Sequence, residues 1–204
     1  MYGALLGTAF LAMIPAMIYA ERARRVKAVF LAAVALVALA LGLLALEYRS
    51  TAWVFATLWL FFVAFNYLEA ALPSLLSRAT RRDNRGTASG VYSTGQFLGA
   101  FLGGSVGGWT LQHNGLGAVF AVCAVLAACW LLWSIGMDAP QYLRSITLSL
   151  DAATAATLEE VSTALQSLPG VREVLVVAGE SIAYVQVDSH FDEQQLNGLP
   201  VSRV

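Results

Sequence analysis

A carboxyl group inside an apolar stretch is the feature of this sequence best suited to chemistry. Glu69 lies within residues 52–76, with Asn66 three residues before it and Pro73 four residues after it. In a helix these residues share one side, and proline has no N–H to bond the carbonyl of Glu69. An ionisable group at that depth in a membrane indicates a place to hold a proton, a cation or water. The alternative is a protonated Glu69 that makes one structural hydrogen bond between helices.

A second candidate surface lies on the glycine-rich stretch 86–108. Small residues four apart form a groove that a neighbouring helix backbone can enter closely, with some sliding if the helices move. The glycines expected to serve helix packing are Gly90, Gly95, Gly99, Gly103, Gly104, Gly107 and Gly108. Tyr92 and Gln96 lie on the same broad face, and Phe97 and Phe101 on the opposite, lipid-facing side. The two polar side chains therefore either line a pore or form hydrogen bonds between helices.

The loop at residues 77–86 is strongly basic. Its charged residues are Arg78, Arg81, Arg82, Asp83 and Arg85. One hypothesis makes this loop a gate latch, which pairs with acidic groups across the cytoplasmic face in one conformation and has Asp83 as its nearest available partner. The other gives it only the task of fixing topology and contacting lipid headgroups.

Five apolar segments must position these groups. The chain is 58% hydrophobic and 12% charged, about half the charge of an ordinary soluble domain. Segments near the usual spanning length of about 20 residues occur at about 1–20, 26–46, 52–76, 87–112 and 116–137. Residues 1–137 are therefore expected to form a multi-pass α-helical membrane domain.

The distribution of basic residues predicts the orientation of these spans. Lys and Arg concentrate in the connections after the first and third segments, whereas the second connection has only Arg49 and the fourth has none. Because cytoplasmic connections carry the excess of Lys and Arg, the first and third connections and the chain after the fifth span are expected on the cytoplasmic side.

The sequence changes character after residue 137. Residues 1–137 carry nine basic and four acidic residues, whereas residues 138–204 carry three and nine. We expect a linker at 138–144 and then a small acidic α+β domain at 145–204. Alternating apolar residues, including Ile146, Leu148 and Leu150, predict strands at 145–151, 171–178 and 181–188; helices are expected at 157–168 and 192–199, with a last strand stub at 201–204. This βαββα order is that of a ferredoxin-like domain.

Several functions lack the residues that they need. The two cysteines, Cys123 and Cys129, both lie in an apolar run and cannot by themselves form a four-ligand metal site. No nucleophile–base pair, phosphate-binding loop or metal-ligand cluster is found. We therefore expect no enzyme activity, no metal or other cofactor and no nucleic-acid partner.

Two runs carry a family resemblance: residues 66–75, N-Y-L-E-A-A-L-P-S-L, and residues 86–99, G-T-A-S-G-V-Y-S-T-G-Q-F-L-G. They resemble the last helices of major facilitator superfamily transporters, and most closely the YajR-like group of drug:proton antiporters. In that group the twelfth helix is followed by a small ferredoxin-like cytoplasmic domain. This sequence departs from the glycine-rich motif of such antiporters, because Gly103 is followed by Gly104 rather than by proline.

The resemblance implies that the five spans match helices eight to twelve of a twelve-helix fold. The chain would then be the C-terminal part of a proton-coupled secondary transporter for efflux, in a bacterial inner membrane. Its implied partners are the lipid bilayer, protons, a small-molecule substrate and the N-terminal transporter helices that lie outside this chain.

A rival hypothesis belongs to a different class. In it the chain is a non-transporting membrane protein, in which the glycine-rich helix drives assembly and the acidic cytoplasmic domain binds a partner.

Overall fold

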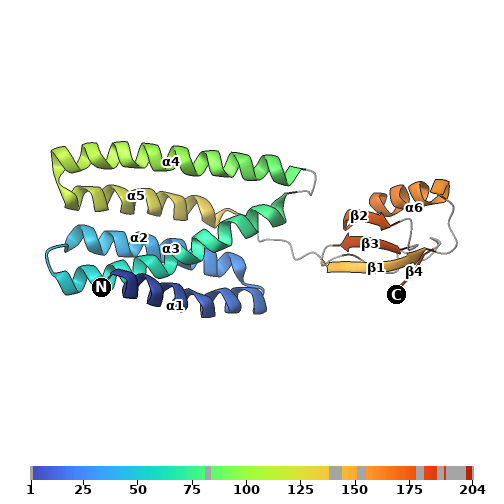
Figure 1. Cartoon of the computed structure of the whole chain (residues 1–204), viewed down its shortest axis with the longest axis horizontal. Helices are drawn as coiled ribbons and strands as arrows, with labels where there is room; N and C mark the ends of the chain where they lie inside the picture. The colour runs from blue at the N-terminus through green and yellow to red at the C-terminus, as the bar shows by residue number, and fades with distance from the viewer. Residues whose placement is uncertain are drawn as a thin grey trace. The chain divides into compact units, whose positions relative to one another are not determined.

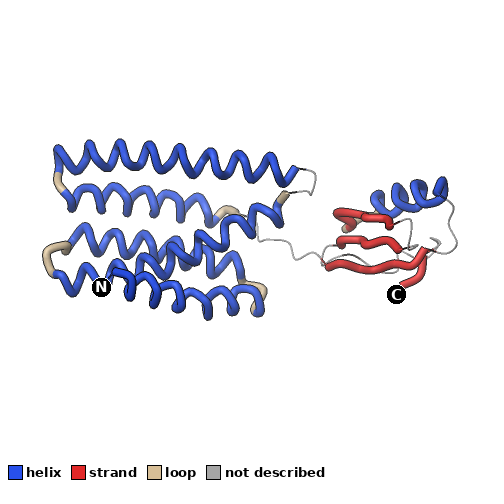
Figure 2. Tube along the Cα trace, viewed as in Figure 1, coloured by secondary structure: helices blue, strands red, loops and turns tan. Residues whose placement is uncertain are grey.

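The computed structural model describes most of the chain, in several stretches. These are residues 2–80, 84–137, 144–150, 155–177, 182–187, 191 and 201–203. The chain divides into two compact units, Met1–Pro140 and Gln141–Val204. In the described residues the first unit contains helices and loops, and the second contains a sheet with one helix (Figure 2). The predicted fold class, a multi-helical membrane protein with a small sheet-containing C-terminal region, is confirmed.

Five long helices form the first unit. They are α1 (Tyr2–Arg22), α2 (Val26–Leu46), α3 (Thr51–Ala79), α4 (Arg85–Asn114) and α5 (Leu116–Ile135). Within the described residues, α1, α2, α3 and α5 are long and apolar enough to cross a membrane, and α4 is not among them. Glycine and polar residues lower the hydropathy of α4, which holds eight glycines. The membrane crossing by α4 therefore stays a prediction.

Helix α2 has a large share of the buried residues of this unit. It packs against α3 and α5, while α1 packs on α3, and α4 lies along α5 (Figure 1). The buried side chains of α2 recur every three or four residues and so share one stripe. They are Val26, Phe30, Ala33, Val34, Val37, Ala40 and Leu44. The rings of Phe30 and Trp130 of α5 form a T-shaped pair, with ring centroids 5.9 Å apart.

A four-stranded antiparallel sheet forms the second unit together with helix α6 (Ala155–Ser167). Its strands are β1 (Arg144–Leu150), β2 (Val171–Val177), β3 (Ile182–Val187) and β4 (Val201–Arg203), in the spatial order β2-β3-β1-β4. Gly170 has φ 91°, a conformation that favours glycine, and it turns the chain from α6 into β2.

The core of this unit follows the period of the strands. Ile146 and Leu148 of β1 are 4% and 1% exposed, as their alternation predicts. They pack with the buried α6 residues Val161 and Leu165. The element order β1-α6-β2-β3, with β4 last, agrees with the predicted ferredoxin-like plan. The second helix predicted at 192–199 lies outside the described residues.

Candidate functional site

A polar cluster joins α3 to α4. The side-chain nitrogen Nε2 of Gln96 donates to the hydroxyl of Tyr92 at 3.2 Å and lies 3.5 Å from Oε1 of Glu69. Tyr92 and Gln96 are one turn apart on α4, and Glu69 faces them from α3. The structure thus brings together three of the four residues predicted for a proton or substrate site.

The depth of this cluster follows from helix geometry. Glu69 is ten residues before Ala79, the end of α3, which at 1.5 Å per residue places it about 15 Å from that end. Pro73 lies inside α3, and the helix continues beyond it. Since Pro73 has no N–H, the Glu69 carbonyl lacks its usual helical partner. A carboxyl, an amide and a phenol therefore lie together, beside a backbone carbonyl that receives no bond from residue 73.

Asn66, the fourth predicted residue, does not join this cluster. It is half-buried, and no hydrogen bond links its side chain to any residue that the structure describes. Glu69 and Gln96 are both exposed on the surface of the helical unit. The cluster is thus accessible from outside this set of helices, while the neighbouring Tyr67 and Leu68 are buried at 4% each.

We predicted that the glycines of α4 make close contacts with a neighbouring helix. Within the described residues they make none. A Cβ atom added at any of the seven predicted positions would meet nothing within 4 Å. Three of them, Gly99, Gly103 and Gly107, line an apolar groove between α4 and α5. Close packing on this face therefore stays a prediction, and the helix that packs there would come from outside the described residues. Phe97 and Phe101 are 77% and 70% exposed.

The basic end of the helical unit contains an ion pair that the sequence did not predict. Nη2 of Arg78, at the end of α3, lies 2.6 Å from Oε1 of Glu21, at the end of α1. Asp83, which we expected as the nearest available partner for this loop, lies outside the described residues, so that expectation stays a prediction. The pair with Glu21 forms because α1 continues to Arg22, which carries Glu21 to the same level as Arg78.

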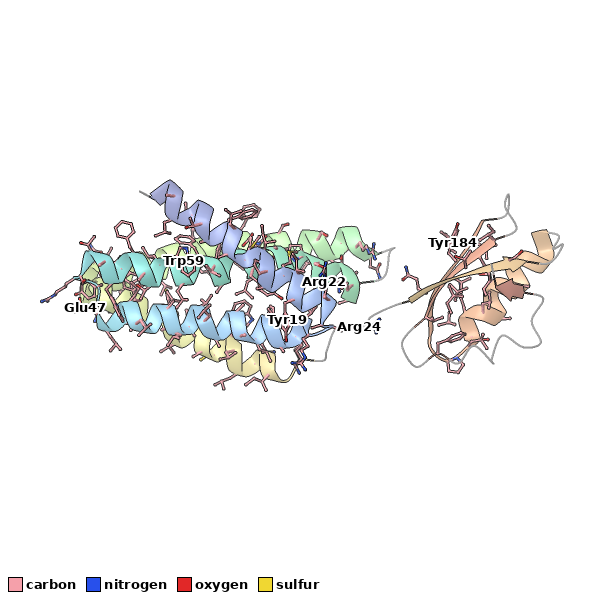
Figure 3. All side chains as sticks on the ribbon, turned by 90° about the horizontal axis from the view of Figure 1, so that it is seen from below. Tyr19, Arg22, Arg24, Glu47, Trp59 and Tyr184 are labelled. Carbon is pink, nitrogen blue, oxygen red and sulfur yellow. The ribbon has the colours of Figure 1, made fainter. Side chains whose placement is uncertain are left out.

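The remaining loop residues are placed only in part. Arg81, Arg82 and Asp83 lie outside the described residues. Arg85 is the first residue of α4 and is exposed. Figure 3 shows Arg22 and Arg24 at the opposite end of the helical unit from Glu47. This separation agrees with the basic connections lying on one side of a membrane.

Two contacts between α1 and α3 were missed from the sequence. One is the Glu21–Arg78 pair, and the other is a hydrogen bond from Nε1 of Trp59 to the Thr8 hydroxyl at 3.2 Å. The signal for Glu21 was a lone acidic residue in an otherwise basic connection. Thr8 and Trp59 carried no signal, because both lie in long apolar stretches.

We expect the Glu21–Arg78 pair to couple weakly in a double-mutant cycle. The side chains are 45% and 32% exposed, and pairs of this kind contribute about 1 kcal/mol or less. Glu21→Gln and Arg78→Gln should each lower thermal stability slightly, and their combination should cost less than the sum. The charge swap Glu21→Arg with Arg78→Glu should recover part of the loss. Arg85→Gln serves as the control, and strict additivity of the two changes would show that the pair adds nothing.

The described residues offer no place for a metal ion. No group of three or more His, Cys, Asp or Glu side chains in them could bind one. The charged residues that the structure describes in the helical unit lie at its ends or in the α3–α4 cluster.

Comparisons with known proteins agree with this architecture. Residues 1–178 match the Major Facilitator Superfamily. The chain is 42% identical over 183 residues, 89% of its length, to the inner membrane transport protein YajR of Escherichia coli strain K12. It is also 34% identical over 76 residues, 37% of this chain and 19% of the relative, to an uncharacterized transporter of Buchnera aphidicola from Baizongia pistaciae.

The matched region spans only part of these relatives. It covers 40% of the length of the Escherichia coli protein. The chain is thus a homologue of an inner membrane transport protein, and four helices of its described residues are long and apolar enough to cross a membrane. Because a family match covers most of its length and its helices have the expected character, the chain belongs to the Major Facilitator Superfamily of transporters.

Proposed function

We propose that this chain forms the C-terminal part of a proton-coupled transporter that exports a small molecule, and that Glu69 is the group that takes up and releases the proton. The observation that carries this proposal is the α3–α4 cluster of Glu69, Gln96 and Tyr92. A carboxyl deep in a helical membrane unit costs free energy, so its presence there indicates a functional role.

The arrangement of the cluster supports this role. Gln96 can donate to the Glu69 carboxylate and can turn to another acceptor when that carboxyl is protonated, because an amide has two donor hydrogens and one acceptor oxygen. The freed Glu69 carbonyl adds an acceptor at the same level. A bound cationic substrate would compete with the proton for these oxygens, and this competition couples the two movements.

Transport also needs a surrounding cavity. Secondary transporters of this superfamily rock two halves of the fold around a site near the bilayer midplane. Glu69 and Gln96 are exposed on this set of helices, so the opposite wall of the cavity would come from the N-terminal transporter helices. On this proposal the 77–86 loop and the acidic unit face the cytoplasm of a bacterial cell, and the loop acts as a latch when the cytoplasmic side closes.

The proposal is tested by measuring proton and substrate movement together. The complete transporter is reconstituted in vesicles that hold a pH-sensitive dye, and small molecules are added one at a time. A transported compound should change the internal pH and should accumulate against its gradient only while a pH gradient exists. A compound that accumulates equally after an ionophore has collapsed the gradient would count against proton coupling.

A further inference from the structure

The side chain of Gln96 is held mainly by its polar neighbours. Its Nε2 lies 3.2 Å from the Tyr92 hydroxyl, one turn earlier on α4, and 3.5 Å from Oε1 of Glu69 on α3. Gln96 is exposed, and a Cβ atom added at Gly95 or Gly99 would meet nothing within 4 Å. Packing by the described residues therefore leaves room around the amide, and its two polar contacts set its orientation.

Tyr92 is better anchored than Gln96. Its side chain is half-buried, whereas that of Gln96 is exposed. A tyrosine side chain has only two rotatable bonds, and glutamine is among the side chains that lose most rotamer freedom when they are ordered. The phenol is thus the rigid member of this pair, and the amide is the member that turns.

The two protonation states of Glu69 favour opposite orientations of the Gln96 amide. An ionised carboxylate only accepts hydrogen bonds, so the amide NH₂ group must face it, whereas a protonated carboxyl can donate to the amide oxygen. A hydroxyl both donates and accepts, so Tyr92 can bond either end of the amide. The contacts of Nε2 with both Tyr92 and Glu69 match the orientation for an ionised carboxylate.

The helices that pack on α3 keep their described charged side chains away from this level. These helices are α1, α2 and α4, and their charged residues lie in the first or last turn: Glu21 and Arg22 on α1, Lys27 on α2, and Arg85 on α4. The side chains that meet the Glu69 carboxyl from α4 are therefore the neutral amide and, through it, the phenol.

We propose that Tyr92 is a positioning residue for proton coupling: its hydroxyl bonds the Gln96 amide in either orientation, so that the amide follows the protonation of Glu69. This inference rests on the proposed function of Glu69. When Glu69 is ionised, the phenol accepts from Gln96 and its own hydrogen points to substrate or water. When Glu69 is protonated and the amide has turned, the phenol donates to the Gln96 oxygen. Release of the proton thus presents one more hydrogen-bond donor to the substrate.

Tyr92→Phe tests this role, because it removes the hydroxyl and keeps the ring. The complete transporter is placed in vesicles that hold a pH-sensitive dye. Uphill accumulation of substrate and the number of protons moved per substrate should each fall about threefold, the effect of one hydrogen bond within a membrane. Exchange of labelled for unlabelled substrate should stay near that of the parent, which also shows that the variant folds.

Tyr19→Phe is the matched control, since it removes the same atom from a ring of α1 that is 53% exposed. Both readouts should be unchanged in this variant. A Tyr92→Phe protein that moves as many protons per substrate as the parent would overturn the role of the hydroxyl.

A double-mutant cycle shows whether Tyr92 acts through Gln96. Gln96→Leu should lower uphill accumulation more than Tyr92→Phe does, and adding Tyr92→Phe to it should cause no further loss. Independent losses would overturn the positioning role. Glu69→Gln separates this result from the proposed function. If Glu69→Gln abolishes uphill transport and Tyr92→Phe has no effect, only the role of Tyr92 is overturned. If Glu69→Gln transports uphill like the parent, both are overturned.

Discussion

Replacing Glu69 by glutamine should abolish proton-driven transport while the protein still folds and inserts in the membrane. Glutamine keeps the size of the side chain and resembles the protonated carboxyl, but it cannot release a proton. Its amide can still bond Gln96, whose Nε2 lies 3.5 Å from the Glu69 oxygen. Uphill movement of substrate in vesicles with an imposed pH gradient should therefore fall to the level of empty vesicles. Exchange of labelled for unlabelled substrate, which needs no net proton movement, should persist.

Glu47→Gln is the matched control for this change. The Glu47 carboxylate accepts hydrogen bonds from the backbone N–H groups of Arg49 and Ser50, at 2.7 and 3.3 Å, in the turn after α2. This local role does not need proton release, so transport should stay near that of the parent. Glu69→Asp should keep partial activity, because the carboxyl survives with a shorter reach. If Glu69→Gln still transports uphill like the parent, Glu69 is a structural hydrogen-bonding residue.

The contacts of Glu69 illustrate how far the sequence predicts a site inside a membrane. Its depth and its relation to Pro73 follow from hydropathy and helix geometry alone. Its hydrogen-bonding neighbour cannot be predicted in this way. The rotation of α3 against α4 is set by how the helices pack, and the sequence of a single helix does not specify it. Tyr92 and Gln96 could be assigned to one face of their helix, but only the structure shows that this face meets Glu69.

The helices differ in how much of their packing could be predicted. The most apolar 18-residue window of helix α2 has a mean hydropathy of 2.9 and is apolar on every side, so no periodicity marks its buried stripe. The sheet is the opposite case. Alternation along β1 predicted that Ile146 and Leu148 would be buried, and they are, because every second residue of this strand, at 145, 147 and 149, is Ser or Thr. The Glu21–Arg78 pair was missed because counts of basic residues predict orientation and not partners.

We expect Leu165→Ala to remove a large part of the stability of the C-terminal unit. Leu165 is 0% exposed and packs in the core between α6 and the sheet. Truncation of a fully buried leucine costs about 2–5 kcal/mol, in part because the cavity does not collapse. A unit the size of Gln141–Val204 has a total stability of about 3–10 kcal/mol at the usual value per residue. The measurement is urea unfolding of this unit, expressed alone and followed by circular dichroism.

Leu175→Ala is the matched control, because it removes the same atoms from the same unit. Leu175 is 46% exposed on β2 and lies opposite Tyr184 of β3, which is 40% exposed. Little apolar surface leaves water at this position on folding, and a truncation there leaves no closed cavity, so its cost should be under about 1 kcal/mol. Equal losses for the two variants would mean that α6 does not cover the opposite face of the sheet. If the parent unit shows no cooperative transition when expressed alone, its core needs contacts from the rest of the protein.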